Sequence, residues 1–226
     1  MVVSQIVNTS FPSLNISDKP SFALQLMDDY DVLHLPVLSE EKFVGLVAKE
    51  DMLDAMDADM HLSSPELLKK LSIEPEENLL GALNLIANHE LSILPVVNAQ
   101  MELQGVILTK EFLKSMSTFL GNDEKGAVIV LETEKRNFSF GELSRLVETN
   151  DAYITQLNTY TEAGTGLVVI TIKINKIEVS DIVATFQRYD YVVRHFYGEE
   201  EYANELKENY QHLLSYLNMQ FLKSIS

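Results

Sequence analysis

Two short segments place charged side chains at the same spacing behind a glycine and an apolar run. The first is Gly45-Leu46-Val47-Ala48-Lys49-Glu50-Asp51, and the second is Gly105-Val106-Ile107-Leu108-Thr109-Lys110-Glu111. If a helix begins after each run, its free N–H groups attract anions, and Lys49 and Lys110 are placed to meet a phosphate. Two plainer interpretations stay open: Asp51 simply complements the helix dipole, and both lysines are solvated surface residues.

Catalytic and metal-binding patterns are missing from the sequence. There is no cysteine, which excludes disulfides, thiolate zinc sites and cysteine nucleophiles. The five histidines, at positions 34, 61, 89, 195 and 212, show no ligand spacing. Neither a glycine-rich phosphate loop nor a Gly-x-Ser-x-Gly elbow is present. We therefore expect a non-catalytic protein with no metal site and no required cofactor.

The composition indicates a folded and strongly acidic protein. Of the 226 residues, 46% are hydrophobic and 23% are charged, and the net charge is −17. Such a surface repels phosphate backbones and anionic lipids, so we expect neither nucleic acid nor membrane as a partner. No run of eighteen apolar residues is present, and the N-terminal residues lack the pattern of a signal peptide, which makes the cytoplasm the expected location.

An internal repeat organises the first half of the chain. Leu35, Pro36 and Val37 return 59 residues later as Leu94, Pro95 and Val96, and Gly45 returns as Gly105 at an offset of 60. Repeated units that are too short to bury a core alone pack against each other. We therefore expect the two copies to form one body with a cleft between them.

Each copy has the same predicted order of helix, strand, polar turn, strand and helix. In the first copy, Ser17 or Asp18 is a candidate cap for the first helix. A glycine inside each second strand indicates close approach of another backbone or a ligand. The first helices are expected to be amphipathic, with one apolar face made of Phe22, Leu26 and Met27, or of Leu79, Leu83 and Ile86. The second strands are predicted at 43–47 and 103–108, and the second helices at 49–56 and 110–119.

The duplication, the two Leu-Pro-Val strands and the Gly-hydrophobic-hydrophobic segments resemble the CBS domain, named after cystathionine β-synthase. The resemblance covers about residues 1–120 and implies a pair of domains whose clefts bind adenosine-containing ligands such as AMP, ADP, ATP or S-adenosylmethionine. In the family, a hydroxyl residue follows the apolar run and receives phosphate, and an aspartate three residues later binds the ribose hydroxyls.

This sequence keeps only part of the family's binding pattern. Asp51 matches the aspartate, but Ala48 and Leu108 stand at the hydroxyl positions, and Glu111 replaces the second aspartate. The ligand-binding residues implied by the resemblance are Asp51, Ala48, Lys49, His34, Leu35, Pro36, Leu94, Pro95, Thr109, Lys110 and Glu111. A histidine at a strand end, like His34, is more often a surface or packing residue than a ligand contact.

The last third of the chain has a different pattern. Strands are predicted at 127–131, 152–159, 167–174 and 191–196, with helices at 140–149 and 179–189. Ser139 and Glu142 have the spacing of a capping box. The order βαββαβ is the ferredoxin-like plan. Residues 141–146 and 150–154 resemble the ACT domain, a regulatory module of amino-acid metabolism, although Phe140-Gly141 stands where that family carries Pro-Gly.

These observations predict an α+β protein in five parts: CBS repeats at 1–60 and 61–120, a linker at 121–126, an ACT-like ferredoxin-fold domain at 127–198 and an amphipathic helix at 199–226. The layout resembles that of acetoin-utilisation proteins. We expect a regulatory sensor of a small-molecule ligand, acting as a homodimer on a separate protein. The alternative is a ligand-free scaffold that uses degenerate CBS clefts to bind a partner protein.

Overall fold

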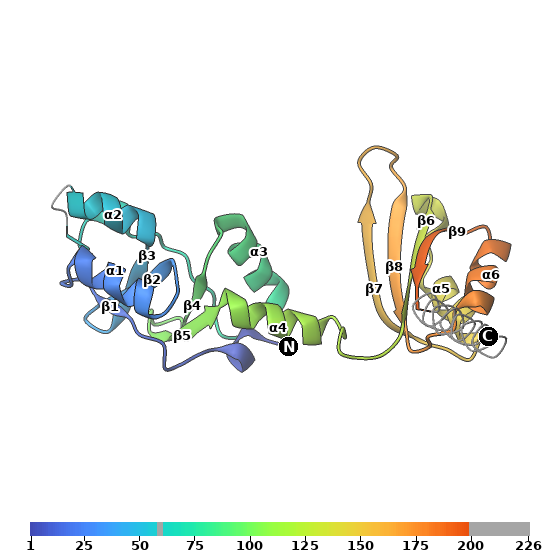
Figure 1. Ribbon diagram of the computed structural model, residues 1–226, viewed down its shortest axis with the longest axis horizontal. Helices are drawn as coiled ribbons and strands as arrows, with labels where there is room; N and C mark the ends of the chain where they lie inside the picture. Colours follow the sequence, from blue (N-terminus) through green and yellow to red (C-terminus); the bar gives the residue numbers. More distant parts are fainter. Residues whose placement is uncertain (58–60, 199–226) are drawn as a thin grey trace, which may run out of the picture. The chain divides into compact units, whose positions relative to one another are not determined.

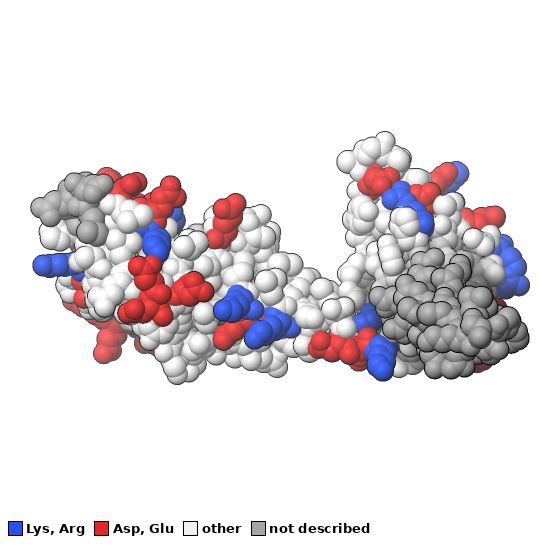
Figure 2. All heavy atoms as spheres, in the orientation of Figure 1, with Lys and Arg blue, Asp and Glu red and all other residues white. Residues whose placement is uncertain are grey.

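The computed structural model describes residues 1–57 and 61–198 (Figure 1). The chain divides into two compact units, with the boundary in the sequence between Phe119 and Leu120. The predicted amphipathic helix at 199–226 lies outside the described residues. Acidic side chains are spread over the visible face of the first unit, with lysines between them (Figure 2). The two units are described separately below.

The first unit contains the two repeats in the predicted order. Both hairpins are antiparallel and pair in the same way: Pro36 lies opposite Leu46, and Pro95 lies opposite Val106. The first repeat comprises η1 (Val3–Ile6), β1 (Leu14–Asn15), α1 (Pro20–Asp29), β2 (His34–Ser39), β3 (Lys42–Ala48) and α2 (Lys49–Asp57). The second comprises η2 (Pro65–Leu67), α3 (Leu79–His89), β4 (Ile93–Val97), β5 (Leu103–Leu108) and α4 (Thr109–Phe119).

The start of α1 differs from the prediction. Lys19 is the N-cap residue and makes no side-chain cap, and Pro20 occupies the first helical turn. Asp18 instead accepts a hydrogen bond from the Asn15 backbone N–H at 2.8 Å. Proline lacks the N–H that a cap would satisfy and already has a helical φ, so it begins the helix without a capping side chain.

The buried faces of α1 and α3 are also narrower than predicted. Phe22 and Leu83, which share the predicted apolar faces, are 46% and 37% exposed, so these faces are only partly buried. The small residues Ala23 and Ala82 are fully buried instead, beside Met27 and Ile86. The buried faces of these two helices therefore include small side chains as well as large ones.

The second unit has the ferredoxin-like fold that the sequence predicts. Its elements are β6 (Ala127–Thr133), η3 (Lys135–Asn137), α5 (Phe140–Glu148), β7 (Ile154–Thr161), β8 (Val168–Ile174), α6 (Ser180–Arg188) and β9 (Val192–Tyr197). The sheet order is β7-β8-β6-β9 with antiparallel neighbours. Both helices pack on one face of this sheet (Figure 1), where alternate residues of β6 join them in the core.

Only half of the predicted capping box on α5 forms. The Ser139 hydroxyl accepts a 3.4 Å hydrogen bond from the Glu142 backbone N–H. The Glu142 carboxylate does not reach back to the cap, because it accepts a 2.9 Å hydrogen bond from the Tyr191 hydroxyl. This tertiary partner is distant in the sequence and outcompetes the local one.

Candidate ligand site

The two repeats meet along a seam at which equivalent residues contact each other. At one end, the Leu33 backbone N–H donates to the Ser92 hydroxyl at 2.9 Å, and these residues are 59 positions apart. At the other end, Lys42 Nζ lies 2.9 Å from Glu102 Oε1, 60 positions away. Contacts between equivalent residues are those of a pseudo-twofold axis, and the two copies form one body, as the repeat predicts.

Each repeat also lends a crossing segment to the other. Lys69 exchanges two backbone hydrogen bonds with Leu46 of β3, at 2.8 and 2.9 Å. Asn8 exchanges two with Val106 of β5, at 2.8 and 3.0 Å. The segments around Asn8 and Lys69 are called the crossing segments below. They bring residues of one repeat to the helix start of the other.

The glycine at the same position of both second strands follows from these crossing segments. A Cβ added at Gly45 would lie 2.9 Å from Leu68 Cβ, and one added at Gly105 would lie 2.5 Å from the Asn8 carbonyl oxygen. The predicted close approach is therefore that of a backbone. Gly105 also has a φ of +140°, which side chains rarely allow.

Asp51 lies in the first turn of α2 and faces a lysine of the crossing segment. Lys69 Nζ lies 2.9 Å from Asp51 Oδ2, and the two side chains are 49% and 31% exposed. Oδ2 itself is buried and has no hydrogen-bond partner, so the contact is an ion pair without hydrogen-bond geometry. This carboxylate keeps unused capacity to accept hydrogen bonds.

His34 is buried beside this pair, so of the two expected roles, surface or packing residue, it has the packing role. Its Nδ1 accepts a 3.2 Å hydrogen bond from the Ser92 backbone N–H and lies 3.1 Å from the Ser92 hydroxyl. Burial lowers the pKa of His34, the charge of Lys69 lowers it further, and the charge of Asp51 acts in the opposite direction. The ring is therefore a neutral acceptor that ties the two repeats together.

The other candidate residues fall into two groups. Leu35, Pro36, Leu94 and Pro95 are buried in β2 and β4, and Ala48 is buried at the end of β3. The remaining four make other contacts or face solvent: Lys49 pairs with Asp28 of α1, the Thr109 hydroxyl donates to the Leu91 carbonyl at 2.5 Å, and Lys110 and Glu111 are exposed. The structure thus brings together Asp51 and His34 but not Lys49.

Lys69 is the residue that sequence reasoning missed. It lies outside both repeated motifs, and it reaches Asp51 only because the second repeat's leading segment crosses to β3. The pair Lys69-Lys70 near the start of the second repeat, in an acidic chain, was the one available signal.

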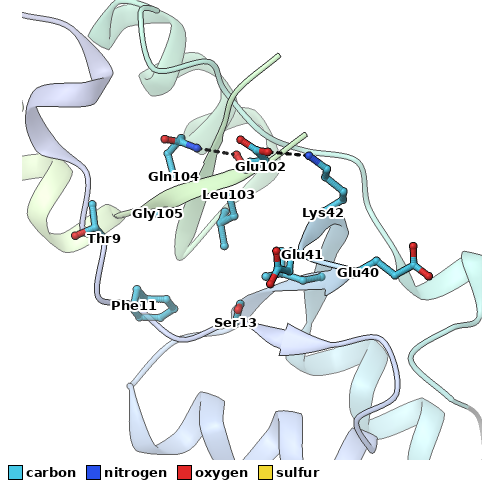
Figure 3. A pocket seen from close by; sticks show the side chains of 11 residues that line it. Thr9, Phe11, Ser13, Glu40, Glu41, Lys42, Glu102, Leu103, Gln104 and Gly105 are labelled. Carbon is cyan, nitrogen blue, oxygen red and sulfur yellow. Dashed lines mark hydrogen bonds and ion pairs between the residues drawn. The ribbon is translucent and has the colours of Figure 1, made fainter. Parts of the chain in front are cut away.

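Two of the cavities in the described part of the first unit lie beside the two ends of the seam, away from Asp51. One of about 400 Å³ lies beside the Lys42–Glu102 end of the seam, where Phe11, Leu103 and the acidic turn residues Glu40 and Glu41 line it (Figure 3). The other, about 390 Å³, lies beside Lys49 and Asp28 and reaches Ser92. Asp51 lines neither of them.

Among the described residues of the second unit, Arg194 forms an ionic network with two glutamates. Arg194 of β9 donates to both carboxylate oxygens of Glu162 at 2.9 and 3.0 Å, and to Glu132 at 2.5 Å. The hydrogen bonds from Arg194 lower the pKa of Glu162 to about 2. This network ties the turn between β7 and β8 to the edge strand β9.

Within residues 1–57 and 61–198, no group of three or more histidine, aspartate or glutamate side chains is placed to hold a metal ion. No helix within the same ranges is long and apolar enough to cross a membrane.

Comparison with known sequences identifies the repeats. The family model of the CBS domain matches residues 3–58 and 65–118. Two curated relatives are each 27% identical to this chain: a homoserine O-acetyltransferase of Methanobrevibacter ruminantium over 120 residues, and an inosine-5'-monophosphate dehydrogenase of Korarchaeum cryptofilum over 114. The matches cover 52% and 50% of this chain, which spans 24% of the length of each relative.

Solved structures with similar folds include a CBS domain pair/ACT domain protein from Thermotoga maritima. It is 30% identical, with 53% of this chain and 99% of that chain covered and a TM-score of 0.48. A putative acetoin utilization protein from Vibrio cholerae is 22% identical, with coverages of 55% and 98% and a TM-score of 0.47.

Two further similar structures were solved with ligands. CBSX2, in complex with AMP, is 20% identical, with coverages of 52% and 97% and a TM-score of 0.46. A CBS domain pair in complex with 5'-methylthioadenosine and S-adenosyl-L-methionine is 16% identical, with coverages of 51% and 99% and a TM-score of 0.43. The chain described here belongs to the CBS domain family and carries its two CBS domains as a tandem pair.

Proposed function

We propose that this chain is a non-catalytic regulatory sensor whose CBS pair binds an adenosine-containing ligand beside Asp51. The observation that carries the proposal is the Asp51–Lys69 pair, in which a carboxylate of the first repeat meets a cation lent by the second at 2.9 Å. The carboxylate is a suitable acceptor for ribose hydroxyls, and the ammonium group is a suitable partner for a phosphate.

The same geometry supplies a route from binding to signal. A ligand held by both Asp51 and Lys69 bridges α2 and the crossing segment, which belong to different repeats. Such a ligand favours the arrangement of the repeats in which both groups reach it, and its differential affinity shifts the population toward that arrangement. The hydrogen bond from Ser92 to His34 joins the two repeats, so a shift of one repeat against the other would change its geometry.

The proposal includes a homodimer in the cytoplasm. Leu53 of α2 and Leu113 of α4 are equivalent positions and are 53% and 63% exposed. Phe22 and Leu80 add exposed apolar area on α1 and α3. Apolar side chains exposed at matching positions of both repeats suit a symmetric interface with a second copy. The ferredoxin-like unit would then act as an ACT-like module that passes the signal on to a separate protein.

A ligand-free scaffold is the second candidate. Ala48 and Leu108 lack the hydroxyl group that the family uses for phosphate, Glu111 is exposed, and Asp51 already has an ionic partner. In this alternative the Asp51–Lys69 pair only fastens the two repeats, and the exposed helix faces bind another protein.

Thermal unfolding of the full chain with AMP, ADP, ATP, S-adenosylmethionine and NAD separates the two candidates. A ligand at a hundred times its Kd adds about 2.7 kcal/mol and raises the midpoint by several degrees. Asp51→Ala should abolish this rise, whereas Asp54→Ala, an exposed acid on the same helix, should keep it. If no compound raises the midpoint, the sensor is refuted and the scaffold is favoured.

A further inference from the structure

The ligand preference of this site depends on which charges surround Asp51. In the described part of the chain, the lysine in contact with Asp51 is Lys69, while Lys49 is paired with Asp28. His34 contributes no positive charge, because its Nδ1 is occupied as an acceptor from the Ser92 N–H. The positive charge next to the carboxylate therefore comes from Lys69.

Lys69 is held in place by its backbone. Its N–H and carbonyl are both hydrogen-bonded to Leu46, at 2.9 and 2.8 Å, so the residue cannot retreat without breaking the crossing segment. Its side chain is 49% exposed and can turn from Asp51 toward a bound molecule. The charge thus stays at the site whether or not Asp51 is occupied.

Binding of a ribose at Asp51 changes which anionic partner is available to the Lys69 ammonium group. Ribose hydroxyls that donate to Asp51 weaken its pairing with Lys69, and the ammonium group then needs another anionic acceptor. A 5'-phosphate supplies one, a neutral nucleoside does not, and the sulfonium group of S-adenosylmethionine adds a second positive charge. The overall charge of −17 opposes anions elsewhere on the surface, so this local cation decides the preference.

We infer that Lys69 makes this site selective for phosphate-bearing adenine nucleotides over neutral adenosine compounds and over sulfonium adenosyl compounds. The inference rests on the proposed function, because it assumes that the ribose is bound by Asp51. It adds the ligand class and names a specificity residue contributed by the opposite repeat, outside the repeated motif.

Calorimetric titration of the full chain with AMP, adenosine and S-adenosylmethionine tests the inference. AMP should bind at least about tenfold more tightly than the other two, because a charge-assisted contact is lost without the phosphate. Lys69→Met should weaken AMP binding about tenfold and leave adenosine binding within about twofold. Lys70→Met is the matched control, since Lys70 is the adjacent exposed lysine, and it should keep the wild-type preference.

The possible failures can be told apart. If none of the three compounds binds, the proposed function and this inference both fall. If adenosine or S-adenosylmethionine binds as tightly as AMP, and Asp51→Ala abolishes that binding, the function stands and the inference is overturned. Unchanged selectivity in Lys69→Met overturns it as well. Should that variant not fold, the wild-type ratios at low and high salt decide: only the AMP affinity should fall with salt.

Discussion

Replacing Gly45 with alanine tests how the ligand site is assembled. The new Cβ would lie 2.9 Å from Leu68 Cβ and 3.2 Å from Leu68 Cα, so backbone, and not a flexible side-chain end, has to move. Leu68 precedes Lys69, whose two backbone hydrogen bonds to Leu46 would be lost or stretched. At about 1 kcal/mol each, their loss destabilises the first unit by about 2 kcal/mol.

Circular dichroism during thermal unfolding of the full chain measures this effect. For a unit of this size, 2 kcal/mol corresponds to a fall of about 5–10 °C in the midpoint of the first unit. Gly81→Ala is the control: its Cβ would meet the Glu77 side chain, which can move, and alanine favours the helix. Equal midpoints for Gly45→Ala and wild type would refute the assigned packing of the crossing segment.

Three other predictions concern pH and assembly. Because the folded pKa of Glu162 is about 2, its pairing with Arg194 stabilises the second unit above pH 4.5, and this stabilisation is lost as the pH falls toward 2. In Glu162→Gln, this part of the acid sensitivity should be missing from acid denaturation curves. A curve identical to that of the wild type would contradict the pairing. The pKa of His34 is lower in the folded chain, so the unfolded chain takes up a proton first and the free energy of unfolding falls as the pH drops below 6.5. His34→Phe should remove this decrease in the free energy of unfolding measured between pH 7 and 5. A decrease that persists in the variant would exclude His34 as its source. The double substitution Leu53→Lys with Leu113→Lys should convert the dimer to a monomer, as measured by light scattering. Glu50→Lys with Lys110→Glu changes exposed charges on the same helices and is the control. If the Leu53→Lys, Leu113→Lys variant is still a dimer, the interface lies elsewhere.

The fold follows from sequence patterns that act over short distances. The alternation of apolar residues and the repeated Leu-Pro-Val and glycine positions predicted both hairpins and the helices after them. The βαββαβ order was likewise readable, since each element carries its own periodicity. The predicted capping box of α5 was wrong for Glu142, because a residue distant in the sequence competes for it: the Glu142 carboxylate accepts a hydrogen bond from Tyr191 and does not bond to the Ser139 backbone N–H.

The site was only partly predictable for the same reason. Asp51 could be placed from its motif. Lys69 reaches Asp51 only because the crossing segment of the second repeat pairs with β3, and no local sequence pattern predicts that pairing. For His34 the sequence left surface exposure and packing both open, because its partner Ser92 is 58 positions away. Phe22 and Leu83 are exposed although they share the predicted apolar faces, since periodicity alone does not say how wide a buried face is.

The central claim, an adenine-nucleotide site beside Asp51, is tested most directly by a ¹⁵N–¹H NMR titration of the full chain with AMP. The account predicts that the largest shifts fall on the backbone amides of residues 48–51 and 68–70, with smaller shifts at Ser92 across the seam, and that Asp51→Ala abolishes them. Shifts confined to the cavity between Phe11 and Glu41, to the second unit, or to no residue at all would contradict it.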